Sequence, residues 1–118
     1  VLRYADVLLM HVESILAGGQ ATSAAAAISS FQQVRNRAGI TSPVSEITKQ
    51  DLLNERRVEL AFENQRLFDL IRFGVAQEQL ALFSGANGYG FSATDLLLPI
   101  PQREINLSNG KMTQNPGY

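Results

Sequence analysis

The segment Asn54–Gly74 constrains the fold more than any other part of the sequence. When it is placed on a helix at about 100° per residue, Leu60 and Leu67 lie on one side, and the reverse side carries Phe62 and other apolar residues. A helix that is apolar on most of its circumference is a buried helix. The sequence therefore predicts a long buried helix around which the rest of the chain is organised.

Charged side chains occupy the same segment, and a buried charge without a partner is very costly. Because residues three or four apart are neighbours on a helix, we expect these charges to pair with one another, with Glu63 pairing with Arg66. The predicted ion network consists of Arg56, Glu59, Glu63, Arg66, Asp69 and Arg72. Its role is structural, since it fixes how the helix docks against its neighbours. The alternative is a solvated helix face with surface ion pairs.

Glu59 and Glu63 also allow a catalytic interpretation, because glycosidases use a pair of carboxylates as acid and base. Arg56 and Arg66 would stabilise both carboxylates as anions and lower their pKa values. A general acid needs a raised pKa instead. The sequence therefore predicts no catalytic residue and disfavours an enzyme.

Composition excludes several classes of function. With 118 residues the chain makes at most one domain, and its 45% of hydrophobic residues suffices for a core. Ten basic and eleven acidic residues give a net charge of −1 without a basic stripe, which argues against a nucleic-acid partner. The absence of cysteine and the single histidine, His11, leave no thiolate or histidine site for a metal, and no cofactor is expected. No apolar run reaches the ~20 residues of a membrane span.

Residues 1–39 predict a helical hairpin of the size found in tetratricopeptide-type repeats. Its first helix spans residues 2–17, with Arg3 and Asp6 on the polar face. Its second helix ends at Gly39, because glycine readily takes the conformation that stops a helix.

Residues 48–83 predict the long helix and one further helical piece. Thr48 caps the long helix, and Asp51, three residues later, completes a capping box. The long helix is expected to run to about Arg72, and the following piece is expected to end at Phe83.

Residues 84–118 predict an irregular tail rich in glycine and proline. Its first part, residues 84–92, is a glycine-rich loop without the Lys-Ser/Thr pair of a P-loop. Such a loop is either a flexible surface loop or a ligand site in which Tyr89 or Phe91 offers a stacking surface. Residues 96–105 are expected to be extended, because two prolines in three residues forbid a continuing helix. Together these elements predict an all-α fold with an irregular tail.

Six motifs occur in order along the chain and cover nearly all of it. They are Leu2–Met10, Val34–Gly39, Asn54–Glu63, Arg66–Arg72, Leu98–Pro101 and Gln114–Tyr118. Together they resemble the C-terminal region of the SusD/RagB family. Within this pattern, Asn64 stands where family members usually have glycine.

The resemblance implies an all-α fold built on tetratricopeptide-like helix pairs and a role in nutrient capture. SusD-like proteins are non-enzymatic outer-membrane lipoproteins of Bacteroidetes, which lie over a TonB-dependent SusC-like transporter and pass glycans, or in some members peptides, to it. The lipid-bearing cysteine of the family lies at its N-terminus, so the membrane anchor is expected outside residues 1–118. Because residue 1 enters a helical pattern without a starting Met, we expect the chain to be a piece of a longer one. The resemblance implies that this piece is the C-terminal part of a cell-surface protein.

The matched motifs look like scaffold, because none of them is a glycan-contact motif in the family. We therefore expect ligand contacts only from the loop at Asn87, Tyr89 and Phe91, whose amide and aromatic side chains suit sugar hydroxyls and ring faces. The alternative is a helical scaffold or protein-interaction unit without ligand binding of its own.

Overall fold

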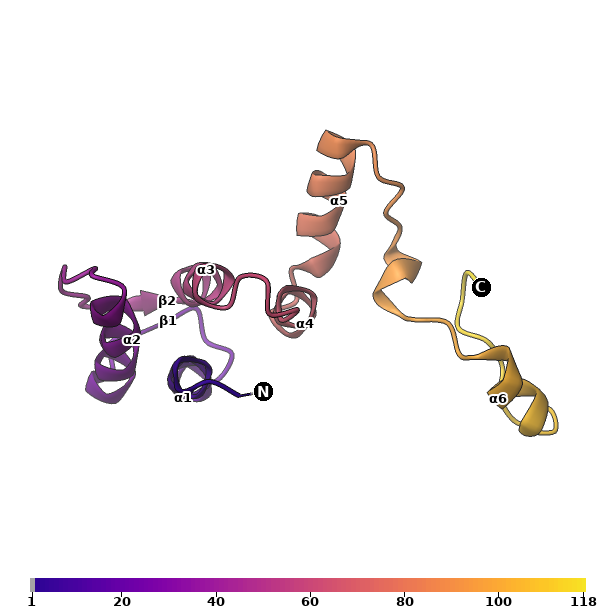
Figure 1. Ribbon diagram of the computed structural model, residues 1–118, viewed down its shortest axis with the longest axis horizontal. Coiled ribbons are helices and arrows are strands. Elements are labelled where there is room, and N and C mark those ends of the chain that lie inside the picture. The colour runs from indigo at the N-terminus through magenta and orange to yellow at the C-terminus, as the bar shows by residue number, and fades with distance from the viewer. Residues whose placement is uncertain (1) are drawn as a thin grey trace. The chain divides into compact units, whose positions relative to one another are not determined.

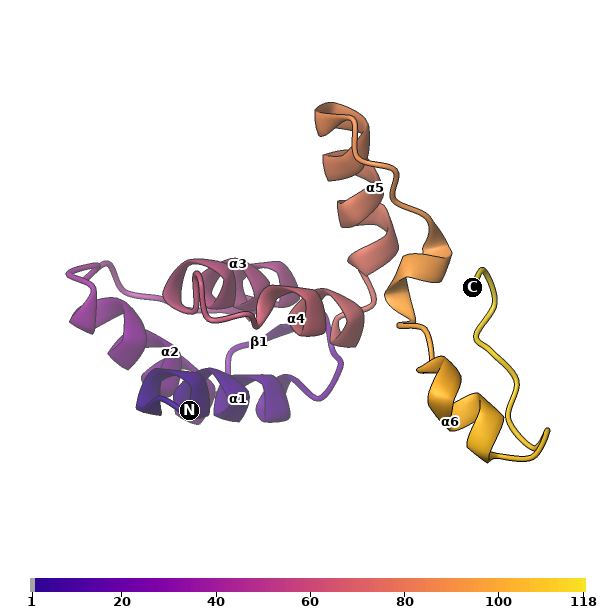
Figure 2. The same ribbon diagram turned by 45° about the vertical axis from the view of Figure 1, so that its right-hand side comes forward.

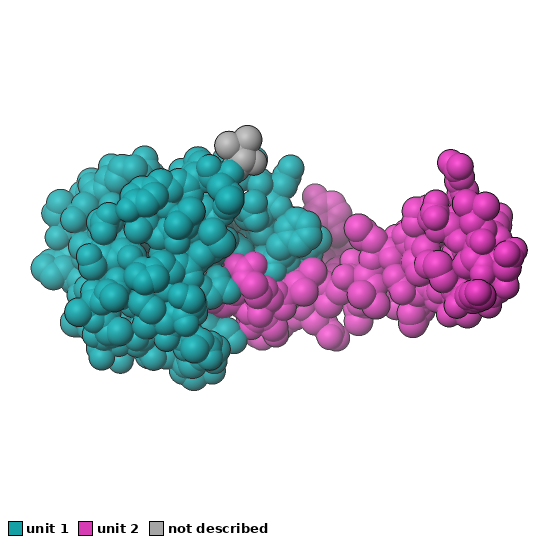
Figure 3. All heavy atoms as spheres, turned by 90° about the horizontal axis from the view of Figure 1, so that it is seen from below, with its two compact units in different colours: residues 1–69 teal, residues 70–118 magenta. Residues whose placement is uncertain are grey.

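The computed structural model describes residues 2–118, and this part of the chain is mostly helical, which confirms the predicted all-α class (Figure 1). The α-helices are α1 (Tyr4–Leu16), α2 (Ala25–Arg37), α3 (Lys49–Glu59), α4 (Arg66–Arg72), α5 (Ala76–Asn87) and α6 (Gln102–Leu107). A short 3₁₀ helix, η1 (Ala93–Leu96), and two short strands, β1 (Ala21–Thr22) and β2 (Ile47–Thr48), complete the elements of this part. The chain forms two compact units, residues 1–69 and residues 70–118, which Figure 3 colours separately.

The first unit is built on the pair α1 and α2, as predicted for residues 1–39, with α3 packed against α1 (Figure 2). Its core consists of apolar side chains from all three helices and β2. These are Leu9, Val12, Leu16, Ala27, Phe31, Val34, Ile47, Leu52, Leu53 and Leu60. The helix pair and α3 therefore bury one common apolar core.

A two-strand antiparallel ribbon holds the loop between α1 and α2 to the start of α3. Ala21 pairs with Thr48 and Thr22 pairs with Ile47. The sequence did not predict this ribbon, because strands of two residues are too short to show an alternating pattern. The capping box at the start of α3 is confirmed, since Asp51 N donates to Thr48 Oγ1 over 3.0 Å and Thr48 N donates to Asp51 Oδ2 over 3.0 Å.

The prediction of one long buried helix is wrong, because the helix is interrupted between α3 and α4. Phe62 and Asn64 adopt positive φ angles of 66° and 59°, in the left-handed region. Asparagine is among the few non-glycine residues that enter this region readily, so Asn64 serves where glycine would be expected. Phe62 is fully exposed, and Val58 and Phe68 are exposed as well. The apolar residues on the reverse side are therefore not buried within this structure.

The second unit contains more helix than the sequence predicted. α5 continues past Phe83 to Asn87 and ends at Gly88, which has a φ of 73°. α6 begins inside the segment that was expected to be extended and runs two residues past its end. Its first residue directly follows Pro101, and proline is compatible with the start of a helix although it stops a helix that precedes it.

Two of the sequence motifs bind each other within the second unit. The side-chain amide of Gln114 forms two hydrogen bonds with the backbone of Ile100. Its Oε1 accepts from Ile100 N over 2.8 Å, and its Nε2 donates to Ile100 O over 2.9 Å. Asn115 Nδ2 donates to Leu98 O over 2.7 Å. The side-chain amides near the end of the chain thus satisfy the backbone of the proline-rich segment, which has no regular partner of its own. None of the helices within residues 2–118 has the length and apolar character needed to cross a membrane.

Candidate functional site

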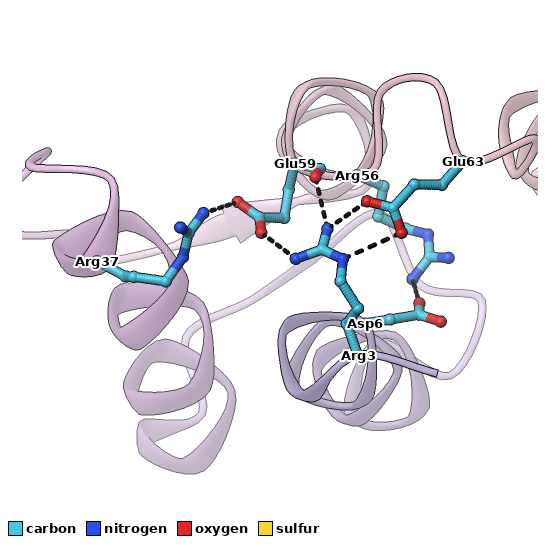
Figure 4. Close-up of polar contacts among 6 residues, drawn as sticks. All are labelled: Arg3, Asp6, Arg37, Arg56, Glu59 and Glu63. Atoms are coloured by element: carbon cyan, nitrogen blue, oxygen red, sulfur yellow. Dashed lines mark hydrogen bonds and ion pairs between the residues drawn. The ribbon is translucent and has the colours of Figure 1, made fainter. Parts of the chain in front are cut away.

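Arg3, directly before α1, lies between the carboxylates of Glu59, at the end of α3, and Glu63, in the turn after it (Figure 4). Its Nη1 donates to Glu59 Oε1 over 2.9 Å, and its Nη2 donates to the backbone oxygen of Glu59 over 2.7 Å. The other side of the guanidinium faces Glu63, with Nε–Oε2 at 3.0 Å and Nη2–Oε1 at 2.7 Å. One guanidinium therefore ties the start of α1 to the end of α3 and to the turn after it.

Glu59 is the most enclosed carboxylate of this cluster, with only 5% of its side chain exposed. Its second partner is Arg37 of α2, at 2.7 Å between Oε2 and Nη2. Burial alone would raise the pKa of Glu59, but the hydrogen bonds from Arg3 and Arg37 outweigh burial and hold the pKa below its ordinary value. This direction is opposite to the one that a general acid requires. The geometry therefore favours a structural role for Glu59 over an acid/base role.

Arg56 of α3 forms a second, more deeply buried ion cluster with two aspartates. Its Nε donates to Asp69 Oδ1 over 3.0 Å, and the side chains of Arg56 and Asp69 are 3% and 1% exposed. Its Nη1 lies 3.0 Å from Asp6 Oδ1 of α1, which makes an ion pair although these two atoms lack the angles of a hydrogen bond (Figure 4). Arg56 therefore links α3 to α1 and to the beginning of α4.

The pairing predicted within a single helix is wrong for Glu59 and Glu63, because the helix breaks between Glu59 and Arg66. Glu59 and Glu63 bind Arg3 instead of arginines on their own helix. Arg66 Nη1 donates to the backbone oxygen of Leu53 over 3.2 Å, so Glu63 does not depend on it. Of the predicted members, Arg56 and Asp69 are paired directly with each other. The guanidinium of Arg72 lies over the ring of Phe73, 5.6 Å from its centroid.

Sequence reasoning missed three partners, Arg3, Asp6 and Arg37. Arg3 and Asp6 were expected on the polar face of the first helix, but Asp6 is buried and Arg3 binds a carboxylate on each side. Their partners lie about half the chain away, so helix spacing carries no signal for them. The six-motif resemblance placed Arg3, Asp6 and Arg37 inside its matched segments, which was the only available hint.

Acidification tests the charged state of Glu59. Because its pKa is lowered in the folded protein, Glu59 stabilises the fold fully above the ordinary value of 4.5, and this contribution is lost as the pH falls from there through the lowered pKa. We expect the Tm of the wild type to fall more steeply below pH 4.5 than that of Glu59→Gln, in thermal unfolding followed by circular dichroism. The control Glu104→Gln, at an exposed glutamate of α6, is expected to follow the wild type. Parallel curves for Glu59→Gln and the wild type would contradict the assignment.

The three candidate ligand residues lie at and after the end of α5. Asn87 Nδ2 donates to Phe83 O over 2.7 Å, so part of its amide is already used within the helix. The ring of Tyr89 stacks on Phe83, with 5.7 Å between centroids and 28° between planes, and both rings are exposed. Phe91 is half-buried, and its backbone N donates to Ser84 Oγ over 3.0 Å. Tyr89 and Phe83 therefore form an exposed aromatic pair, of which the sequence had singled out only Tyr89.

Residues 2–118 contain no group of three or more His, Asp or Glu side chains arranged to hold a metal ion. The same part of the chain carries buried ion pairs and an exposed aromatic pair, Phe83 and Tyr89.

The family model described as the SusD family matches residues 1–118. The starch-binding protein SusD of Bacteroides thetaiotaomicron is 34% identical over 123 residues, which covers 100% of this chain and 21% of that protein. The SusD-like protein P2 of Formosa agariphila is 33% identical over 133 residues, which covers 99% of this chain and 25% of that protein. The chain thus spans between a fifth and a quarter of the length of these relatives.

Solved structures show the same fold. A laminarin-binding SusD-like protein matches all of this chain with a TM-score of 0.78 and 39% identity, and the match covers 23% of that protein. The surface glycan-binding protein A from Bacteroides thetaiotaomicron, in complex with laminarihexaose, matches 98% of this chain with a TM-score of 0.78 and 33% identity, and the match covers 24% of that protein.

Proposed function

Since this chain belongs to the SusD family, we propose that it is the C-terminal part of a larger, non-enzymatic protein that captures glycans for uptake. The observation that carries the proposal is the match of nearly the whole of this chain to parts of proteins whose names specify starch, laminarin and laminarihexaose. The lowered pKa of Glu59 supports the non-enzymatic part, because it removes the best carboxylate candidate for a general acid.

For the whole protein, we propose the cellular location and the transporter partner that the family resemblance implies. It would work at the cell surface of the outer membrane, held by a lipid anchor outside residues 1–118, and would pass its glycan to a SusC-like TonB-dependent transporter. Family membership is the support for both the location and the transporter partner.

Within that protein, residues 1–69 would serve as scaffold. The guanidinium of Arg56 and the carboxylate of Glu59 each pair with oppositely charged side chains, and only 3% and 5% of these two side chains are exposed. Side chains that are already paired in the interior have little capacity left for a sugar. The two ion clusters therefore support a structural role for this unit.

Residues 87–91 remain the proposed glycan contact in this part of the chain. The exposed ring of Tyr89, which Phe83 supports by stacking, offers an apolar face of the kind that packs against a sugar ring. Asn87 retains the oxygen of its amide as an acceptor for a sugar hydroxyl, and Phe91 borders the same loop. The alternative function, a helical scaffold that binds no ligand, predicts that these side chains are irrelevant to affinity.

Isothermal titration of the full-length protein with laminarihexaose and starch oligosaccharides tests both proposals. We expect saturable binding to at least one of them, and a rise in Kd of about 2- to 10-fold for Tyr89→Ala, as expected for the loss of one aromatic contact of about 0.5–1.5 kcal/mol. The matched control Tyr118→Ala removes another exposed tyrosine and is expected to leave Kd unchanged. Absence of binding by the wild type would favour the scaffold alternative, whereas binding that Tyr89→Ala leaves intact would exclude only the proposed contact.

A further inference from the structure

A small cavity opens at the turn between α3 and α4, in the segment that interrupts the expected helix. Its volume is about 190 Å³. It is lined by Arg56, Arg57, Leu60, Ala61, Phe62, Asn64, Gln65 and Arg66. The cavity therefore combines three guanidiniums, two side-chain amides and an apolar rim.

The cavity carries positive charge that the described part of the chain does not neutralise. Arg56 is engaged by Asp6 and Asp69, but Arg57 and Arg66 form no ion pair with any carboxylate of residues 2–118. Burial and the neighbouring charge of Arg57 lower the pKa of Arg66, although Asp69 acts in the opposite direction. An anion in the cavity would relieve the repulsion between these two guanidiniums and would accept their free N–H groups.

The volume of the cavity limits what this anion is. Small-molecule sites usually occupy about 300–1,000 Å³, so a cavity of about 190 Å³ is too small for an oligosaccharide. The cavity volume is several times the roughly 30 Å³ that one water molecule occupies. The space therefore suits a single acidic side chain.

Phe62 at the rim indicates that the anion belongs to a polypeptide. It is fully exposed, and it holds a φ of 66° that a bulky residue rarely adopts. Such strain persists where the surrounding structure enforces it, and it clusters at functional sites. An exposed aromatic side chain beside arginines is the composition found at the centre of protein interfaces.

We propose that an Asp or Glu side chain from the portion of the polypeptide outside residues 1–118 docks in this cavity, and that an apolar residue beside it covers Phe62. The inference rests on the proposed function, in which the chain is part of a larger protein. The relatives are long enough to supply such a segment, since the chain covers only 21% and 25% of them. The arginines of the cavity favour an acidic side chain by charge complementarity, and the exposed ring of Phe62 favours an apolar residue next to it.

Site-specific cross-linking of the purified full-length protein tests the docking. p-Benzoylphenylalanine replaces Phe62, the protein is irradiated, and the cross-linked peptides are identified by mass spectrometry. We expect a cross-link within the same molecule, to a segment outside residues 1–118 at a position directly next to an Asp or Glu. Arg57→Gln is expected to lower the yield of this cross-link several-fold. The control Arg103→Gln, at another exposed arginine without an ion pair in residues 2–118, is expected to leave the yield unchanged.

A second measurement tests the mapped ion pair in protein that carries no cross-linker. Once the acidic residue is mapped, its amide variant and Arg57→Gln are expected to lower Tm by amounts that do not add in the double variant, because both remove the same ion pair. A cross-link to residues 70–118 or to another molecule, no cross-link at all, or additive shifts in Tm would overturn the proposal. Glycan titration is independent of these results, so failure of the docking proposal is distinguishable from failure of the proposed function.

Discussion

Replacing Arg56 with methionine is expected to lower the free energy of unfolding by about 3–5 kcal/mol, because the change leaves two buried carboxylates without their shared cation. Asp6 and Asp69 lie 3.0 Å from Arg56 atoms, and the side chains of Arg56 and Asp69 are almost completely shielded from solvent. Methionine fills most of the same volume, so the loss reports the electrostatic imbalance and not an empty space.

Urea unfolding of the full-length protein, followed by circular dichroism, measures this loss. The control Arg103→Met, at an exposed arginine of α6, is expected to change stability by no more than about 0.5 kcal/mol. The double variant Arg56→Met with Asp69→Asn is expected to recover part of the loss, because one of the two buried charges disappears with its partner. A loss of only a few tenths of a kcal/mol for Arg56→Met would show that this cluster is solvated.

The sequence predicted the local elements well where each one carries its own signal. The pair α1 and α2 followed from helical periodicity and a glycine stop, and the capping box at Thr48 and Asp51 followed from residue type and spacing. These features depend on residues that are close together in the chain, so the chain alone specifies them.

The break between α3 and α4 could not be derived in the same way. Asn64 is the only residue in the turn that favours a left-handed conformation, and Phe62 beside it adopts one against its preference. The segment otherwise consists of residues that are compatible with helix. Tertiary contacts hold the turn, since Arg3, directly before α1, binds Glu63, and Arg56 binds Asp69 across the break.

The same reason explains why the candidate site was predicted only in part. The sequence indicated that the charges of this region are paired, but it assigned them to partners on one helix. Glu59 is in fact paired with Arg3, directly before α1, and with Arg37 of α2. Similarly, Tyr89 was selected as an exposed ring, whereas its support by Phe83 depends on α5 continuing to Asn87. Residue spacing predicts contacts within one helix, but it does not predict contacts between helices that are far apart in the sequence.

These contacts give the first unit two kinds of restraint on α1. Ion pairs at Arg3 and Asp6 fix its direction and register against α3, since a guanidinium donates to carboxylate oxygens only in a narrow geometry. Apolar burial supplies the remaining attraction, because it is roughly proportional to area and has no preferred direction. Mutation can separate these two contributions. Replacing a buried apolar side chain in the middle of α1 changes the apolar contribution and leaves the ion pairs in place.

Leu9→Ala is expected to destabilise the protein by about 2–5 kcal/mol, the usual cost of emptying a leucine site in a packed core. Leu9 is among the largest side chains in the first unit that are completely shielded from solvent, on the helix that packs against both α2 and α3. The control Met10→Ala shortens the adjacent, exposed side chain and is expected to cost about 0.5 kcal/mol or less in the same urea titration. Because Leu9 carries no charge, its loss is expected to be the same at low and high salt. Equal losses in the free energy of unfolding for Leu9→Ala and Met10→Ala would mean that α1 does not pack on the core through this face. The helix pair would then not form the core of the first unit.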